Sequence, residues 1–177
     1  MTGRLPLHAL YALAVLIAAT GCGDFGVPES QVEVALSVGD VDAFKRDLQP
    51  SLGIRCGSLD CHGNSGRALR LYAERGRRMS ADLRGKEATK DEIAANVRAF
   101  SGIWVVGESV DKHLALRKPL AVEAGGIGHV GPAIWDAKDD AGYACLKAWL
   151  LGESDAQAAQ QACQEDATAA QALLQKP

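Results

Sequence analysis

The fold is decided by the stretch Cys56-Gly57-Ser58-Leu59-Asp60-Cys61-His62-Gly63, which combines two cysteines with a histidine. Covalent attachment of a c-type haem needs two thiols that add to the vinyl groups and an imidazole beneath the iron. His62, directly after the second cysteine, supplies that imidazole. Four residues separate the cysteines where the usual spacing is two, so the loop must bulge out of helical geometry, and Gly57 and Ser58 make this easy.

Two other interpretations of this stretch stay open. In an oxidising compartment Cys56 and Cys61 would form a local disulfide and His62 would be an ordinary loop histidine, although closing so short a loop stabilises only modestly. A zinc site would need a fourth ligand besides these three residues, and the remaining cysteines lack the short spacing that zinc knuckles show.

Iron in an electron carrier generally takes two axial ligands from the protein. Beyond His62, the chain after its N-terminal segment offers His129, Met79 and His113. We expect His129 to be the second ligand, because its Gly-rich loop can approach a flat porphyrin closely. Met79 follows two arginines and suits a surface, and His113 suits a solvated or packed helix position. Two imidazoles favour a low reduction potential and leave no open coordination position, which favours electron transfer over catalysis.

Further residues extend the pattern on both sides of the motif. They are Leu48-Gln49-Pro50 and Arg55 before it, and Lys118-Pro119-Leu120, Gly125 to Gly131, Asp140, Tyr143 and Trp149-Leu150-Leu151-Gly152 after it. Together with Cys61-His62-Gly63, they resemble a cytochrome c-like domain of the planctomycete-type group, over about Asp47 to Gly152. The resemblance implies a small helical domain with one covalent haem c, and it points to His129 as the distal ligand.

Residues 1–21 predict an export signal. They contain one basic residue, Arg4, an apolar run from Leu10 to Ala19, and small residues before Cys22. The run is shorter than the roughly 20 apolar residues that cross a bilayer. Ala19-Thr20-Gly21-Cys22 resembles a bacterial lipobox, in which Cys22 is lipidated and becomes the N-terminus, and several acyl chains would make the membrane attachment lasting. The alternative is an ordinary secretory signal with an incidental Cys22.

The composition suits one compact domain with appendages, at 177 residues, 18.6 kDa and 23% charged residues. We expect a mostly α fold: a signal peptide over 1–21, a tether and lead-in over 22–38, a cytochrome c-like domain over 39–152, and an Ala-rich C-terminal helix over 153–177.

Capping residues ahead of apolar positions with helical period delimit the helices. They predict a helix from Asp40 that Pro50 breaks or kinks, a helix with a capping box at Thr89 and Glu92, a helix from Asp139 or Asp140 to Gly152, and a last helix from Ser154. Apolar residues at alternate positions are compatible with a short strand over 31–38.

Cys145 and Cys163 fall on the last two predicted helices. Two antiparallel helices joined by a short turn bring such positions together, so we expect a disulfide between them that stabilises the fold by about 3 kcal/mol. Pairing of either residue with Cys56 or Cys61 belongs to the haem-free interpretation.

The formal net charge of −3 argues against a nucleic-acid partner. A local basic cluster nevertheless follows the motif. It consists of Arg67, Arg70, Arg75, Arg77, Arg78, Arg84 and Lys86. One interpretation is that the cluster docks an acidic partner or neutralises haem propionates. The other is that it is an ordinary solvated face.

These observations favour an exported electron-transfer protein with one haem c, bound by Cys56, Cys61, His62 and His129. It would be lipid-anchored in the cell envelope, facing the periplasm or the cell exterior, and would serve redox protein partners. The sequence contains no phosphate loop, Ser-His-Asp set or paired-carboxylate motif that would favour an enzyme. The alternative is a haem-free, disulfide-stapled surface lipoprotein that acts as a binding or structural module.

Overall fold

The computed structural model describes residues 40–104 and 108–175. Backbone contacts divide the chain after Val34, and all described residues belong to the second unit, Ala35–Pro177. The expected export signal, the lipidated Cys22, the tether and the short strand over 31–38 lie outside the described residues. Of the helices within 40–104 and 108–175, none has the length and apolar character that crossing a membrane requires.

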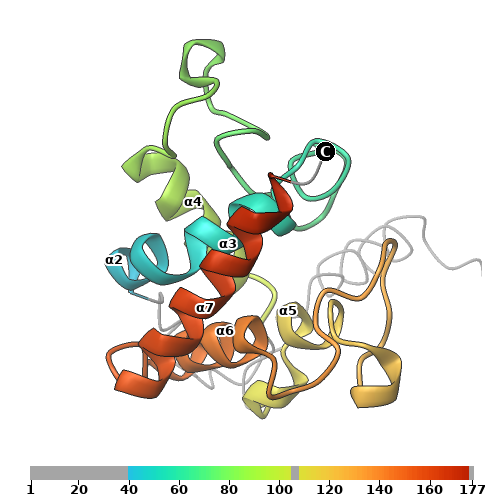
Figure 1. The fold of residues 1–177 in the computed structure, drawn as a ribbon. Helices are drawn as coiled ribbons and strands as arrows, with labels where there is room; N and C mark the ends of the chain where they lie inside the picture. Colours follow the sequence, from blue (N-terminus) through green and yellow to red (C-terminus); the bar gives the residue numbers. More distant parts are fainter. Residues whose placement is uncertain (1–39, 105–107, 176–177) are drawn as a thin grey trace, which may run out of the picture. The chain divides into compact units, whose positions relative to one another are not determined.

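The described part of the chain is helical, as the sequence predicts, and its β contacts are two isolated bridges. Its helices are α2 (Val41–Ala43), η1 (Phe44–Leu48), α3 (Gln49–Arg55), η2 (Ala81–Leu83), α4 (Lys90–Ser101), η3 (Val110–Lys112), α5 (Leu114–Arg117), η4 (Val122–Ala124), α6 (Ala141–Leu151) and α7 (Gln157–Leu173), as Figure 1 shows.

Pro50 reshapes the first helix without ending it. Asp40 caps the helix, because its Oδ1 accepts the N–H groups of Asp42 at 2.8 Å and Ala43 at 3.1 Å. Proline has no N–H to donate to the preceding turn. The chain forms the wider π-helical turn η1 immediately before it and then continues as α3. The predicted break is therefore a π-helical interruption, and α3 runs on to the residue before Cys56.

Both caps predicted for the later long helices are present. The Thr89 hydroxyl accepts the Glu92 N–H at 3.3 Å, and the Glu92 carboxylate accepts the Thr89 N–H at 2.9 Å, which completes the capping box of α4. Asp140 caps α6 by accepting the Gly142 N–H at 3.0 Å. α6 ends at Gly152, whose φ of 73° is readily adopted only by glycine.

α7 begins at Gln157 and not at the predicted Ser154. Ser154 is buried in the connection between the helices, and the Ala156 N–H donates to the Glu153 carbonyl at 3.1 Å, so a turn precedes the helix. The turn reverses the chain and lays α7 against α6.

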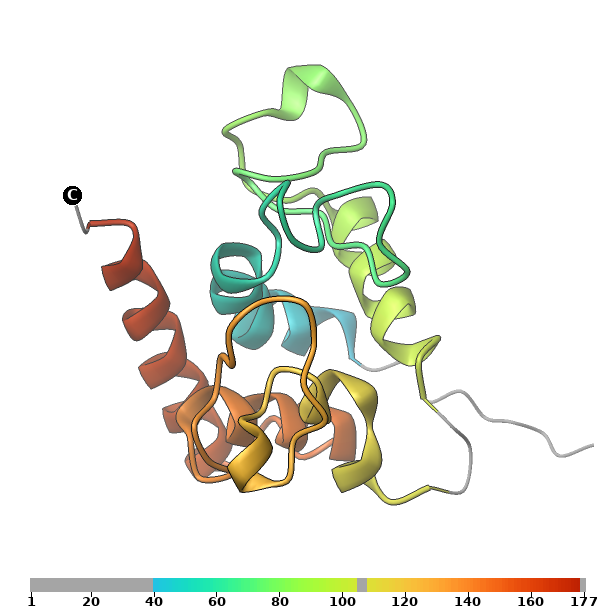
Figure 2. The ribbon, with the colours of Figure 1, turned by 90° about the vertical axis from the view of Figure 1, so that its right-hand side faces the viewer.

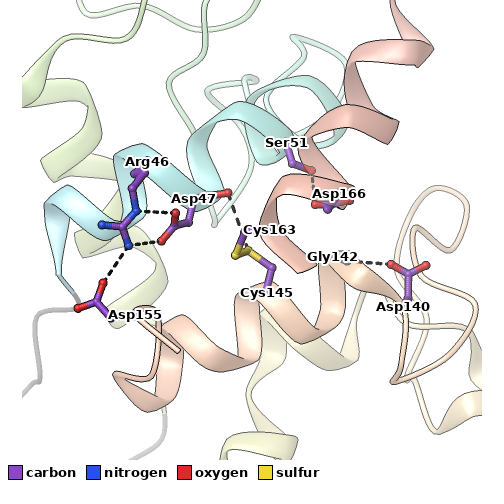
Figure 3. The surroundings of a disulfide bond; sticks show 9 residues. All are labelled: Arg46, Asp47, Ser51, Asp140, Gly142, Cys145, Asp155, Cys163 and Asp166. Carbon is purple, nitrogen blue, oxygen red and sulfur yellow. Dashed lines mark hydrogen bonds and ion pairs between the residues drawn. A yellow bond between two sulfur atoms is a disulfide. The ribbon is translucent and has the colours of Figure 1, made fainter. Parts of the chain in front are cut away.

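Cys145 of α6 and Cys163 of α7 lie at disulfide distance, in the pairing that the sequence predicts (Figure 3). Their sulfur atoms are 2.03 Å apart and their Cα atoms 4.8 Å apart. Both side chains are buried in the core. The bond therefore ties the C-terminal helix to the body of the domain.

The core is built from apolar and aromatic side chains of several helices. Phe44 of η1 packs edge-on against Trp149 of α6, with ring centroids 5.2 Å apart, and its ring is tilted against that of Phe100 of α4 at 5.6 Å. Trp135 and Tyr143 continue the core with a centroid distance of 5.8 Å. These aromatic residues are part of the general core, which holds α3 and the loop that follows it in place.

α7 also contacts α3 through a buried carboxylate, Asp166. The Ser51 hydroxyl donates to Asp166, and Arg55 Nε lies 3.1 Å from its Oδ1 (Figure 3 labels Ser51 and Asp166). Gly142 of α6 leaves room for this contact because it has no side chain. A Cβ at this position would lie 2.8 Å from Asp166 Oδ1. The end of α3, next to Cys56, is thus held by the last helix of the chain.

Candidate functional site

The motif loop, Cys56–Gly63, folds back on the end of α3. The His62 N–H donates to the Cys56 carbonyl at 2.9 Å, and the N–H groups of Cys61 and Gly63 both donate to the Ser58 carbonyl, at 3.0 and 2.8 Å. These bonds gather the residues between the cysteines into a compact, non-helical turn. The bulge expected from the wide cysteine spacing is therefore present.

Glycines allow this loop to pack tightly against the segment that follows it. A Cβ at Gly63 would lie 2.5 Å from the Gly57 carbonyl oxygen, and a Cβ at Gly76 would clash with the same atom. A Cβ at Gly57 would lie 2.6 Å from that of Ala73. Since the Gly57 carbonyl is backbone, no side-chain rotation relieves the first two clashes, and only glycine fits at these positions.

Cys56 and Cys61 are the cysteines of the described residues that stand outside a disulfide. Cys61 is exposed, and Cys56 is partly buried at the end of α3. Burial, together with the charges of the nearby Cys61 and Asp166, raises the pKa of the Cys56 thiol to about 12. The Cys56 side chain is therefore a protonated thiol at neutral pH, with the second thiol near enough to influence it.

His62 is oriented by a backbone carbonyl. Its Nδ1 lies 2.9 Å from the carbonyl oxygen of Leu69. A carbonyl only accepts, so Nδ1 carries a proton, and in the neutral imidazole Nε2 is the nitrogen with the lone pair. Imidazoles that bind metals are commonly held in this way, with one nitrogen bonded to a carbonyl and the other to the metal. The backbone is fixed as well, because the Leu71 N–H donates to the His62 carbonyl at 2.8 Å.

A polar cluster anchors this segment to the helices. Asn96 of α4 donates to the Tyr72 carbonyl at 2.9 Å and to Gln49 Oε1 at 2.8 Å, and it accepts the Tyr72 N–H at 2.8 Å. Gln49 of α3 donates to the same Tyr72 carbonyl at 3.0 Å. The roles of Asn96 and Leu69 could not be predicted from the sequence, because nothing in their local pattern shows that Asn96 meets Tyr72 or that Leu69 meets His62.

His129 lies in the Gly-rich loop, residues 125–131, which Figure 2 shows as the orange loop that rises beside η4. Its base is held by the N–H groups of Gly126, which donates to the Ala121 carbonyl at 3.0 Å, and of Ile127, which donates to the Arg117 carbonyl at 3.1 Å. Gly128 has a φ of 68°, which favours glycine and sharpens the turn.

The structure brings His129 into electrostatic range of His62. Burial lowers the pKa of His129, and the charges of His62, Lys118 and Arg67 lower it further. Coulombic influence weakens with distance and with screening by solvent, so the two imidazoles lie near enough for their charges to interact.

The structure places the two alternative ligands, His113 and Met79, in different surroundings. His113 is only 5% exposed, and its Nδ1 accepts the Ala115 N–H at 3.1 Å, so it caps α5. Its ring packs against Trp104 with a centroid distance of 5.0 Å. Met79 is 46% exposed, and its backbone N–H donates to Glu92 at 2.8 Å.

Arg78 is not part of a solvated or docking surface, contrary to the sequence interpretation of the basic cluster. Its side chain is 2% exposed and donates through Nε and Nη2 to the buried Glu92 carboxylate, at 3.0 and 2.7 Å. It also donates to the carbonyls of Leu83, Lys86 and Glu87. Burial opposes ionisation of Glu92, but Arg78 and two backbone N–H groups overcome it and hold its pKa at about 2.

Apolar side chains lie exposed on both loops of the candidate site. Leu59 of the motif loop is 57% exposed, and Ile127 and Val130 of the Gly-rich loop are 43% and 80% exposed. A single exposed apolar residue is ordinary, but here such residues accompany both histidines.

The fold and site define a small helical domain that carries a Cys-Cys-His loop and a Gly-rich histidine loop, whose histidines influence each other electrostatically. No protein-family model, curated protein or solved structure matches this chain. Within 40–104 and 108–175, no group of three or more His, Cys, Asp or Glu side chains has metal-binding geometry.

Proposed function

We propose that the protein is an exported, lipid-anchored electron carrier with one covalent haem c. Cys56 and Cys61 would form the thioethers, and His62 and His129 would be the iron ligands. The observation that carries the proposal is the orientation of His62, whose Nδ1 is bonded to the Leu69 carbonyl while Nε2 is left for a metal. This imidazole belongs to a loop that also carries two unpaired thiols.

The surrounding residues fit such a group. A porphyrin has two flat apolar faces, and the exposed Leu59, Ile127 and Val130 offer apolar surface on both loops that it would cover. Burial of several such side chains is worth about 25 cal/mol for each Å² of apolar surface removed from water. Cys56 is a protonated thiol, and a thiol is what each attachment consumes. Its sulfur bonds one vinyl carbon and its hydrogen goes to the other, so the atoms balance without an added oxidant.

Bound haem supplies reversible one-electron exchange at its iron. The chain's own residues set the conditions for this exchange. The Leu69 carbonyl fixes the tautomer and orientation of His62, and the lowered pKa of His129 keeps its imidazole neutral, the form that binds metals. Two imidazoles would occupy both axial positions, which favours electron transfer over binding of small ligands.

The test is an absorption spectrum of the exported protein, co-expressed with a cytochrome c maturation system. We expect a Soret band with sharp reduced α and β bands, and haem that stays with the polypeptide on a denaturing gel. The Cys56→Ala, Cys61→Ala variant should lose both signals. A colourless wild-type protein whose Cys56 and Cys61 are disulfide-bonded would refute the haem proposal.

The distal ligand is tested by two single variants of the haem-bearing protein. His129→Ala should keep the covalent haem but change the spectrum toward an open coordination position, which an added imidazole would fill. Met79→Leu is the matched control and should leave the spectrum unchanged, because Met79 has no part in the proposed ligand pair. The reverse result would assign Met79 and not His129.

The lipid anchor is tested separately. Labelling cells with a radioactive fatty acid should mark the protein, and Cys22→Ala should abolish the label and release the protein from the membrane fraction. Release without loss of haem would show that the anchor and the cofactor are independent features.

A haem-free surface lipoprotein is the second candidate. The observation that favours it is the Cys145–Cys163 pair, because the same oxidising surroundings would also act on Cys56 and Cys61. Thiol counting on the unfolded, unreduced protein separates the two candidates, since a disulfide between Cys56 and Cys61 is cleaved by a reductant and a haem thioether is not.

A further inference from the structure

A cavity opens beside the motif loop, and neither the loop's cysteines nor the two histidines line it, although Leu59 does. It has a volume of about 470 Å³, in the usual range for sites that bind small ligands. Its walls come from the end of the motif loop and from the segment 76–84. The lining includes Leu59, Asn64, Ser65, Arg77, Met79 and Arg84.

Arg77 lines this cavity and is held by its surroundings without a hydrogen-bond partner at Nε within the described residues. This Nε is buried. Its guanidinium lies over the Tyr72 ring, with Cζ 5.6 Å from the ring centroid, which holds the group in place. A buried donor without a partner lowers the stability of the folded protein.

The charge of Arg77 is also unpaired. Across the part of the chain that the structure describes, no ion pair includes Arg77 or Arg84. The neighbouring Arg78 is different, because it forms an ion pair with Glu92. Arg77 and Arg84 are therefore the arginines of this segment whose charges a ligand could pair with. The carboxylates closest to these arginines in the sequence, Glu74 and Asp82, are exposed to solvent, and Asp82 accepts a hydrogen bond from the Ser80 hydroxyl.

The lining points to the class of ligand. Guanidinium groups bind carboxylates with paired, charge-assisted hydrogen bonds. Asn64 and Ser65 add neutral polar groups, and the exposed side chains of Leu59 and Met79 add an apolar wall that suits a short carbon chain. We propose that this cavity is a carboxylate-binding site, in which Arg77 and Arg84 hold the anion. The inference does not depend on haem.

The carboxylate has two sources with the same chemistry, a free small acid and an acidic side chain of a protein partner. Succinate and a hexaglutamate peptide are the probes that separate them, with inorganic phosphate as the anion of another class. Each is titrated into the purified full chain by calorimetry and followed through the Arg77 Nε–H resonance. Succinate binding alone indicates a metabolite site, and binding of the peptide alone indicates a docking site.

We expect saturable binding of at least one carboxylate probe and a downfield shift of the Arg77 Nε–H resonance. Arg77→Gln should weaken the binding about tenfold or more, since it removes charge-assisted hydrogen bonds. Arg75→Gln is the matched control, because Arg75 is exposed on the same segment and does not line the cavity. It removes the same charge and should change the affinity less than about twofold.

Three outcomes would overturn the inference. They are no saturable binding of either carboxylate probe, equal losses in Arg75→Gln and Arg77→Gln, and binding of phosphate in place of both carboxylates. If Arg77→Gln fails to fold, Arg77→Lys serves as the second variant, since it keeps the charge and loses the planar fork. Full affinity in Arg77→Lys, with no shift of the Arg77 resonance in the wild type, would also refute the site.

Discussion

At the residue scale, Arg78 and Glu92 form the most deeply buried ion pair of the described residues. The side chains are 2% and 0% exposed, and Glu92 also accepts from the backbone N–H groups of Met79 and Thr89. Glu92→Gln leaves the arginine charge buried without a counter-charge. We expect it to lower the free energy of unfolding by about 3 to 5 kcal/mol, measured by urea denaturation at neutral pH.

Glu92 also makes the stability of the folded protein depend on pH in the acid range. Its pKa is about 2 in the folded protein against an ordinary value of 4.5, so the unfolded chain takes up the proton first. The stabilising contribution of Glu92 is complete above pH 4.5 and is lost as the pH falls toward 2. Urea denaturation across this range should show a steeper loss in the wild type than in Glu92→Gln. Parallel pH profiles would contradict the assignment.

At the scale of an element, α5 depends on a neutral histidine cap. Burial lowers the pKa of His113, and a protonated Nδ1 could no longer accept the Ala115 N–H. The unfolded chain is protonated below the ordinary value of 6.5 while the folded protein resists, so stability is full above pH 6.5 and falls below it. His113→Asn keeps a capping side chain without a titrating group and should flatten this part of the profile in thermal unfolding.

A second histidine requires a control for that experiment. The pKa of His129 is also lowered, so it adds to the loss of stability over the same pH range. His129→Asn therefore measures the share that does not come from α5. A wild-type profile that His113→Asn leaves unchanged would show that the cap does not titrate.

The α6–α7 hairpin is an element held by a covalent bond. The Cys145–Cys163 link closes a loop with a sequence separation of 18 residues. Loop-closure entropy of that size corresponds to about 3 kcal/mol. Cys145→Ala, Cys163→Ala should lower the free energy of unfolding in urea by that amount, and reduction of the wild type should have a similar effect. Equal stability of the oxidised and reduced wild type would contradict the expectation.

At the scale of the whole domain, we expect Asp166 to control access to Cys56. Asp166→Ala removes the partner of Ser51 and Arg55 at the end of α3, so this end should open more often. Alkylation of Cys56 in the haem-free protein should become several-fold faster, as followed by mass spectrometry. Asp155→Ala is the control, because the Asp155 side chain is 87% exposed and its pair with Arg46 lies on the surface. Equal rates in both variants would refute the role of Asp166.

Local patterns predicted much of this domain. The capping box of Thr89 and Glu92, the Asp140 cap and the Gly152 stop each depend on residues within a few positions, so the sequence was sufficient to place them. Burial of Arg78 could not be predicted, because its partners include carbonyls from three later positions that only the folded chain brings together. The same holds for Asp166, whose contact with Ser51 spans 115 residues.

Some features of the candidate site could likewise be predicted from the sequence, and others could not. The thiols and His62 stand next to one another in the sequence and were found directly. The Leu69 carbonyl that orients His62 was missed, because backbone acceptors leave no mark in a sequence. His129 was predicted from its Gly-rich loop and from a family resemblance, whereas its electrostatic coupling to His62 is a property of the fold.

The contact of Asp166 with α3 also has a consequence in time. A ribosome completes α3 and the motif loop long before α7, since the contact joins positions 115 residues apart. During that interval the end of α3 lacks Ser51's partner, so we expect the Cys56 thiol to be less enclosed. An enzyme that modifies Cys56 would therefore meet its easiest substrate in the unfinished or newly exported chain, and docking of the last helix would close that window.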